Sequence, residues 1–329
     1  ENFIIKRKNI KIKKPIYVSG LARSGTTVIT HLLDEYSDVG SFKYKDLPFY
    51  TIPYFWNKIN FLYFIKNLKK ERIHRDGILV SPESPDSFEE LIWRKNIKNY
   101  NENGFCKILD SNNVNVKLID DLKNNIRKVL HIRNKNRYLA KGNYNLFRFK
   151  FIIDLFPDCK IILCVRDPVL TAFSLERLHN QFMQYSYLDK NFSKELLYLS
   201  HFEFGINRKP INLNKVNTEK SIDSWKKNNS FLGYLYQWID VYNFIKINYL
   251  DNPTLSKNFI VVDNDDLKNN FYPEVQRIFD FCDLGAIKNI EKLNYNITKH
   301  KLREFNINEI KVVNEAKNLF KIYKENYFK

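Results

Sequence analysis

GLARSGTT, residues 20–27, decides how this chain folds, because it joins an apolar run ending in PIYVS to an amphipathic run beginning VITHLLDEY. The apolar run predicts a buried strand over 15–20, and the amphipathic run predicts a helix over 26–36. A short glycine-containing turn between a strand and a helix is the context in which a phosphate-binding loop occurs. The stretch therefore predicts a βα unit whose loop binds an anion.

The residues of the loop indicate how the anion is bound. Backbone N–H groups after the two glycines, with the helix N-terminus behind them, favour an oxyanion. Thr26 stands where a nucleotide-hydrolysing loop has lysine, and Arg23 supplies a cation inside the loop instead. A tight βα turn without a ligand is the alternative. The predicted anion-binding residues are Arg23, Ser24, Gly25, Thr26 and Thr27.

Two further apolar runs, KIILCV at 160–165 and NFIVVD at 258–263, predict strands that are each followed by a helix. Asp167 and Pro168 are typical of a helix start, and FRFKFIIDLF predicts a helix over 144–156. Alternation of strands and helices predicts an α/β protein, a three-layer α/β/α arrangement around a central parallel sheet. We expect the phosphate site at the carboxyl ends of the strands.

No repeat, low-complexity tract or linker divides the chain, so we expect one domain over 1–329. Residues 44–135 are aromatic and charged without strong strand signals, which predicts a mainly helical insertion. A C-terminal helical region is expected from about residue 273 to 329. Both regions are expected to shape a cleft.

The formal net charge of +17 favours an anionic partner, although the lysines are dispersed, as on an ordinary solvated surface. Nucleic acid is disfavoured, because no recognition module is present and the aromatic residues are not interleaved with arginines. No apolar run reaches the roughly 18 residues of a membrane span. A cytoplasmic location is expected, and the start at Glu1 is compatible with a piece of a longer product. The oligomeric state is left open.

The four cysteines predict neither a disulfide framework nor a metal site, because their spacing forms no C-x-x-C pair or Cys/His cluster. They are Cys106, Cys159, Cys164 and Cys282. VVDNDD at 261–266 offers carboxylates for magnesium, but a surface turn explains it equally well. No metal is expected.

GLARSGTT resembles the 5′-phosphosulfate loop of sulfotransferases that use 3′-phosphoadenosine-5′-phosphosulfate (PAPS), with Ala22 in place of the usual proline. In VRDPVLTAFSLERL, Arg166 and Ser174 have the spacing of that family's 3′-phosphate site. YLAKGNYN resembles the lysine segment of tyrosylprotein sulfotransferases, which implies that Lys141 contacts the transferred sulfuryl group. The resemblance is clear over 15–40 and 138–180 and weaker over 236–285.

This resemblance implies a transferase that moves a sulfuryl group from PAPS to an acceptor hydroxyl or amine and releases adenosine 3′,5′-bisphosphate. Arg23 and Lys141 would neutralise charge at the reacting centre. We expect a carbohydrate or glycan acceptor, because aromatic residues of the insertion can stack on sugar rings. A protein tyrosine or a small molecule is the alternative acceptor, and a nucleotide or nucleoside kinase is the alternative class, which the missing lysine disfavours.

The general base has three candidates. SPDSFEELIW at 84–93 resembles the base-bearing segment of heparan N-sulfotransferases, which implies Glu90, although an acidic first helical turn explains it as well. Asp46 lies in SFKYKD, after the loop helix, where tyrosylprotein sulfotransferases carry a glutamate. His74 is the third candidate, although a lone histidine is more often structural. We rank them in that order.

Overall fold

The computed structural model describes residues 1–59, 69–97, 108–109, 114–286 and 304–328. Its centre is a five-stranded sheet with the order β2-β5-β1-β6-β7, in which all neighbouring strands are parallel. The strands are β1 (Ile16–Ser19), β2 (Val39–Ser41), β5 (Arg137–Lys141), β6 (Lys160–Val165) and β7 (Phe259–Asp263). The strands predicted around 15–20, 160–165 and 258–263 are confirmed.

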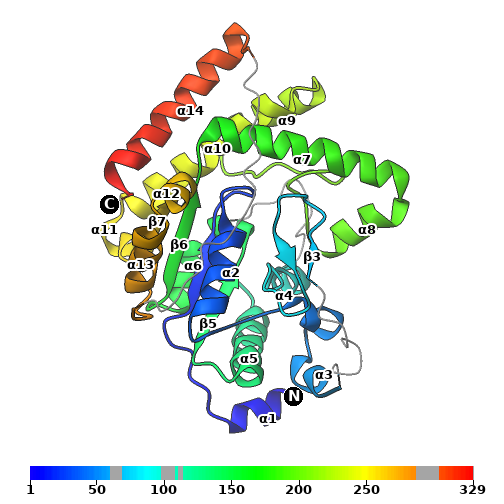
Figure 1. The fold of residues 1–329 in the computed structure, drawn as a ribbon, viewed down its shortest axis with the longest axis vertical. Coiled ribbons are helices and arrows are strands. Elements are labelled where there is room, and N and C mark those ends of the chain that lie inside the picture. The colour runs from blue at the N-terminus through cyan, green and yellow to red at the C-terminus, as the bar shows by residue number, and fades with distance from the viewer. Residues whose placement is uncertain (60–68, 98–107, 110–113, 287–303, 329) are drawn as a thin grey trace.

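The alternation of side chains along the strands creates two separate cores. Ile16 and Val18 of β1 face a core shared with α2 (Thr26–Tyr36) and α13 (Phe271–Phe281). Tyr17 faces the opposite core, which includes α5 (Val116–Arg133), α6 (Phe149–Leu155) and α10 (Ser230–Ile245). Figure 1 shows α2 and α13 together on the near side of the sheet. The predicted three-layer α/β/α arrangement is confirmed.

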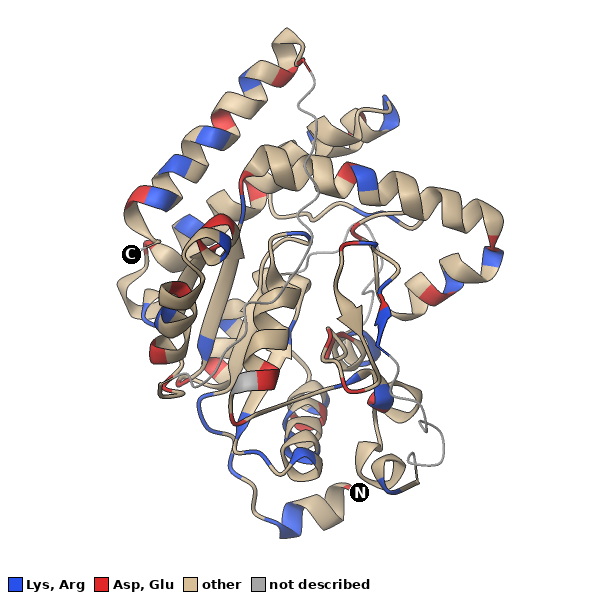
Figure 2. Ribbon diagram, in the orientation of Figure 1, with Lys and Arg blue, Asp and Glu red and all other residues tan. Residues whose placement is uncertain are grey.

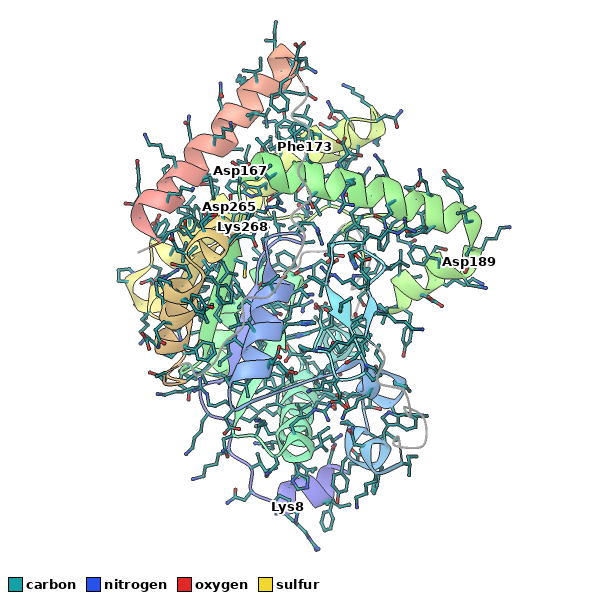
Figure 3. All side chains as sticks on the ribbon, viewed as in Figure 1. Lys8, Asp167, Phe173, Asp189, Asp265 and Lys268 are labelled. Atoms are coloured by element: carbon teal, nitrogen blue, oxygen red, sulfur yellow. The ribbon has the colours of Figure 1, made fainter. Side chains whose placement is uncertain are left out.

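The connection after β6 brings a long helix across the carboxyl end of the sheet (Figure 1). Helix α7 (Pro168–Leu188) begins at the predicted N-cap, where the Asp167 carboxylate accepts a hydrogen bond from the N–H of Leu170 at 2.9 Å. Asp167 and Asp189 mark the two ends of this helix in Figure 3. The predicted start of α7 therefore lies beside the predicted phosphate loop.

The remaining helices surround these layers. They are α1 (Asn2–Arg7), α3 (Pro53–Ile59), α4 (Glu90–Asn96), α5 (Val116–Arg133), α6 (Phe149–Leu155), α8 (Lys190–Tyr198), α9 (Lys215–Lys226), α10 (Ser230–Ile245), α11 (Pro253–Ser256), α12 (Asn264–Asn269) and α14 (Ile307–Asn326), with 3₁₀ turns at Tyr44–Phe49 and Asn143–Phe147 and a π-helical turn at Lys246–Leu250. Helix α14 packs on α10, where the Tyr323 hydroxyl donates to the carbonyl of Tyr242 at 2.8 Å.

The structure differs from the sequence expectations, or adds to them, in three places. Strands β2 and β5 were missed, because β2 has three residues and β5 begins and ends with a charged residue. The described part of 44–135 contains a two-stranded antiparallel hairpin of β3 (Lys70–Glu71) and β4 (Leu79–Val80) in addition to helices. The helix expected over 144–156 is a 3₁₀ turn followed by α6, with a break at Arg148, whose φ and ψ are −113° and 0°.

Charged residues of both signs are interspersed over the elements (Figure 2), which agrees with the dispersed lysines of the sequence. Within the described ranges, no helix has the length and apolar character needed to cross a membrane. The same ranges contain no group of three metal-ligating side chains in reach of one ion. Cys159, Cys164 and Cys282 are buried and unpaired, and Cys106 lies outside the described residues.

Candidate functional site

The loop between β1 and α2 is shaped by two left-handed residues. Gly25, the residue before α2, has φ +99°, and Arg23 has φ +75°. A Cβ on Gly25 would lie 2.4 Å from the Oδ1 atom of Asn264, which follows β7. Only glycine fits both this backbone angle and this close approach. The N–H groups at the start of α2 consequently face the carboxyl end of the sheet, where a helix N-terminus favours an anion.

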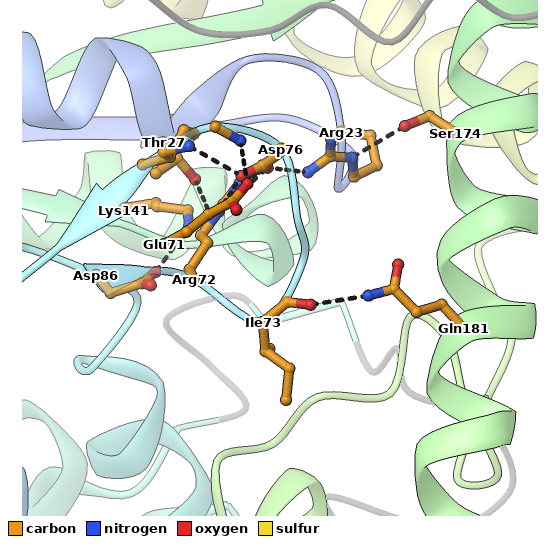
Figure 4. Close-up of polar contacts among 12 residues, drawn as sticks. Arg23, Thr27, Glu71, Arg72, Ile73, Asp76, Asp86, Lys141, Ser174 and Gln181 are labelled. Atoms are coloured by element: carbon orange, nitrogen blue, oxygen red, sulfur yellow. Dashed lines mark hydrogen bonds and ion pairs between the residues drawn. The ribbon is translucent and has the colours of Figure 1, made fainter.

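Arg23 connects this loop to α7. Its Nε atom donates to the Ser174 hydroxyl at 3.0 Å (Figure 4), and its carbonyl accepts a hydrogen bond from Arg166 at 3.3 Å. Arg166 directly follows β6, and the indole N–H of Trp238 donates to its carbonyl at 3.2 Å. The two residues predicted for a 3′-phosphate therefore both contact Arg23 of the loop, although they come from different elements.

Lys141 is the last residue of β5 and pairs in register with Val18 of β1. Its ammonium group forms an ion pair with Asp86 at 2.7 Å, and the Tyr44 hydroxyl donates to the same carboxylate at 2.9 Å. Burial raises the pKa of Asp86, but the charges of Lys141 and Arg72 outweigh it and hold the pKa well below the ordinary range. The Asp86 carboxylate is therefore ionised at neutral pH.

The β3–β4 hairpin contributes a second ion-pair cluster to the site (Figure 4). Asp76 accepts a hydrogen bond from Arg23 at 2.7 Å and one from the Nε atom of Arg72 at 2.9 Å. Arg72 also donates from NH1 to the Thr27 hydroxyl at 3.2 Å. Burial raises the pKa of Asp76, but Arg72 and Arg23 lower this pKa by a larger amount. The carboxylate is therefore also ionised at neutral pH.

These groups surround one pocket. Arg23, Thr26 and Thr27 line it from the loop, Arg72 and His74 line it from the hairpin, and the rest of the wall comes from three further segments. This part of the wall consists of Asp86, Ser87, Lys141, Asn143, His201, Glu203 and Phe204. The pocket therefore combines cations from three elements with two partly buried carboxylates and two histidines.

The three candidate bases lie in different places. Glu90 is 4% exposed, is absent from the pocket wall and accepts two hydrogen bonds from Arg148, at 2.9 and 2.7 Å. Asp46 is also absent from that wall, and it is bound by Arg133, Asn57 and the N–H of Lys43. Of the three, His74 alone lines the pocket.

The partly buried ring of His74 lies between two aromatic rings, with its centroid 5.3 Å from that of Phe182 and 5.8 Å from that of Phe204. Burial and the nearby charge of Arg72 lower its pKa well below 6.5, so the imidazole is neutral at pH 7. Its Nδ1 atom is buried without a hydrogen-bond partner among the described residues.

Sequence reasoning missed Asp86, Arg72 and Asp76. Asp86 stands in the stretch SPDSFEELIW, from which Glu90 was chosen instead. Pro85, the residue before Asp86, forms an isolated bridge with Lys43, and this pairing has no signal in the sequence. Arg72 and Asp76 lie in ERIHRDG, where no sequence pattern separates ligand-binding residues from an ordinary charged turn.

The fold and the pocket define an α/β protein with a loop of the phosphate-binding type at the carboxyl end of a parallel sheet. The sequence matches the model of the Sulfotransferase family over residues 15–208, more than half of the chain. The chain belongs to this family and is a sulfotransferase. The family and fold class expected from the sequence are confirmed.

Solved structures of bacterial sulfotransferases also match. STF1 from Mycobacterium tuberculosis H37Rv has 14% identity and a TM-score of 0.45, with 85% of this chain and 70% of that chain covered. STF9 from Mycobacterium avium has 13% identity and a TM-score of 0.46, with 98% of this chain and 71% of that chain covered. A sulfotransferase from Alicyclobacillus acidocaldarius has 14% identity and a TM-score of 0.40, with 86% and 87% covered. No curated protein sequence matches this chain.

Proposed function

We propose that this sulfotransferase takes its sulfuryl group from PAPS and transfers it to a hydroxyl or amine of a carbohydrate or glycan. The observation that carries the proposal is the double contact of Arg23, at 3.0 Å to the Ser174 hydroxyl and through its carbonyl to Arg166. A donor with phosphates at both its 5′ and 3′ positions needs two adjacent anion sites. The loop provides the first, and Arg166 with Ser174 provides the second.

The loop residues Arg23, Ser24, Gly25, Thr26 and Thr27 would bind the 5′-phosphosulfate through backbone N–H groups, hydroxyls and the Arg23 guanidinium. Lys141 would contact the sulfuryl group, since its ammonium lines the same pocket as Thr26 and Thr27. Charge develops on the oxygen that leaves with the 5′-phosphate, and fixed cations that need no reorganisation lower the barrier. Arrangement of the reactants supplies the rest of the catalysis.

For the general base, the geometry favours Asp86 over the candidates chosen from the sequence. Its carboxylate lies 2.7 Å from the Lys141 ammonium and its side chain is 17% exposed, so an acceptor can reach it. When Lys141 turns to the sulfuryl group, the pKa of Asp86 rises and the carboxylate can take the acceptor proton. His74 is the second candidate, because it is neutral and lines the pocket, but burial and the charge of Arg72 disfavour its protonation.

The support for a carbohydrate acceptor comes from exposed aromatic residues of the insertion, Phe49 and Phe55, which do not line the pocket themselves. The side chains of Phe49 and Phe55 are 47% and 45% exposed, and the ring of Phe49 lies 4.7 Å from that of Trp56. Exposed aromatic faces of this kind suit the apolar faces of sugar rings. A protein tyrosine or a small molecule remains the alternative acceptor. Membership of the Sulfotransferase family favours sulfuryl transfer over the kinase alternative.

The test compares two nucleotides that differ only in the 3′-phosphate, adenosine 3′,5′-bisphosphate and adenosine 5′-monophosphate. Wild-type protein is expected to bind the bisphosphate at least 10-fold more tightly by calorimetry. Arg166→Ala should lose about 10- to 100-fold in affinity for the bisphosphate alone, since hydrogen bonds to charged groups contribute about 1.5–3 kcal/mol. Arg127→Ala, an arginine of α5 that hydrogen-bonds the Ile10 carbonyl, is the control.

Equal affinity of the wild type for both nucleotides would refute the 3′-phosphate assignment. Binding of ATP with magnesium but not of the bisphosphate would refute the donor itself. Transfer from labelled PAPS to a panel of glycans, peptides and small hydroxyl compounds then separates the acceptor classes. Exclusive labelling of a tyrosine peptide would overturn the carbohydrate proposal.

A further inference from the structure

Arg72 is a buried cation of the donor pocket that comes from the β3–β4 hairpin and not from the loop or the sheet. Its side chain is 10% exposed. The NH1 atom lies 3.2 Å from the hydroxyl of Thr27, one of the residues that line the pocket beside Lys141. A guanidinium has five N–H donors in a fixed plane, so one hydrogen bond to Thr27 leaves NH1 a second hydrogen to donate.

The hairpin fixes the direction of this side chain. Asp76 accepts from the Nε and NH2 atoms of Arg72, which are the donors on the side away from Thr27. The hairpin is itself anchored, because Gln181 of α7 donates to the carbonyl of Ile73 at 2.9 Å and the N–H of Gly77 donates to Glu71 at 2.8 Å (Figure 4). NH1 is therefore directed at the loop by contacts on the opposite side of the guanidinium.

Arg72 and Lys141 both act on the carboxylate of Asp86, which lines the pocket. The charges of both lower the pKa of Asp86, with Lys141 in direct contact at 2.7 Å. An anion that replaces Asp86 at Lys141 would therefore also be within the field of Arg72. A sulfuryl group has three oxygens in different directions, so two cations from separate elements can each reach one of them.

We propose that Arg72 contacts the sulfuryl group of the bound donor and that Asp76 positions it, an inference that rests on the PAPS donor proposed above. In the transfer, the acceptor oxygen forms a bond to sulfur and the bond between sulfur and the bridging oxygen breaks. The electron pair stays on the departing 5′-phosphate, and the acceptor proton goes to Asp86. Arg72 stabilises the negative charge of the sulfuryl oxygens throughout this step.

The test measures binding of PAPS and of adenosine 3′,5′-bisphosphate, which lacks the sulfuryl group, to the same variants by calorimetry. Arg72→Gln is expected to weaken PAPS binding by about 10- to 100-fold, the range for a hydrogen bond to a charged group, and bisphosphate binding by less than 3-fold. This variant keeps the 2.7 Å pair of Arg23 and Asp76, so no carboxylate is left unpaired. Arg72→Lys keeps the charge without the fork and should lose about 3- to 10-fold for PAPS.

Arg75→Gln is the matched control, because Arg75 belongs to the same hairpin, is exposed and lies over the Tyr185 ring at 5.9 Å. Both of its affinities should stay within 2-fold of the wild type. Equal losses for the two nucleotides in both Arg72 variants, or no loss for either, would overturn the role of Arg72. Failure of the wild type to bind either nucleotide would instead refute the donor assignment, and the Arg72 proposal with it.

Discussion

Asp76→Asn tests whether the donor pocket depends on a buried carboxylate to balance its cations. The Asp76 side chain is 5% exposed, and its partners Arg23 and Arg72 are 14% and 10% exposed. Asparagine keeps the shape but removes the charge, which leaves two desolvated guanidinium groups without their counterion. Removing one partner of a buried ion pair costs about 3–5 kcal/mol, and we expect about 3 kcal/mol because both arginines retain some contact with water.

The assay is urea unfolding at pH 7, with and without adenosine 3′,5′-bisphosphate. A bound anion replaces the missing charge, so the ligand should stabilise Asp76→Asn more than it stabilises the wild type and should reduce the deficit. The pKa of Asp76 is lowered by Arg72 and Arg23 against the effect of burial, so its contribution is present above the unfolded pKa of about 3.9 and is lost as the pH falls through the lower folded value.

Asp283→Asn provides the control for this experiment, because Asp283 pairs with Lys14 at 3.0 Å where both side chains are nearly half exposed. Solvent screening limits such a pair to less than about 1 kcal/mol, and the ligand should not change that difference. An Asp76→Asn variant as stable as the wild type would refute the reasoning about burial. A deficit of the same size with and without ligand would refute the idea that the donor anion takes over the role of Asp76.

Three further predictions concern separate parts of the chain. Burial raises the pKa of Glu89 to about 7 from 4.5, so urea stability should fall by about 3 kcal/mol between pH 4.5 and 7, and Glu89→Gln should remove this part of the pH dependence. Asp86→Asn should lower kcat for transfer from PAPS by about 10²- to 10⁴-fold. Glu90→Gln should lower urea stability and leave kcat within about 3-fold, because Glu90 contacts a buried arginine outside the pocket. The reverse result would restore Glu90 as the base. Gly25→Ala should lower the free energy of unfolding by about 1–3 kcal/mol in thermal unfolding. Adding Asn264→Ala should recover only part of this loss, since the positive φ remains. Full recovery would show that the backbone angle has no cost.

The fold was predictable where one segment carried both a period and a boundary signal. The run before GLARSGTT is apolar throughout, and the Asp167-Pro168 pair marks the start of α7 to the residue. Strand β5 gave no such signal, because RYLAK has charged residues at both ends and becomes a strand only through pairing with β1 and β2. This strand is stabilised by pairing with its neighbours in the sheet, and a single sequence does not show which segments pair.

The same distinction explains the site. The loop residues, and the pair Arg166 and Ser174, belong to short continuous motifs. The sequence alone was therefore enough to predict them as site residues. The choice between Glu90 and Asp86 as the proposed base depends on which carboxylate of SPDSFEELIW pairs with an arginine elsewhere in the chain. Glu90 pairs with Arg148, 58 positions later, whereas Asp86 reaches Lys141 in the pocket. Nothing within the stretch itself distinguishes these two outcomes.

The arrangement of charge would explain why Asp86 lines the pocket proposed for an anionic donor and why Asp76 pairs with two of its arginines. Buried guanidinium and ammonium groups without a counterion would destabilise the folded chain by several kcal/mol each. A carboxylate beside each cation removes that cost while the donor is absent. The donor must then displace these carboxylates, and its binding exchanges one anion for another instead of creating new ion pairs. We therefore expect donor affinity to depend on how readily Asp76 and Asp86 release Arg23 and Lys141, as much as on the cations themselves.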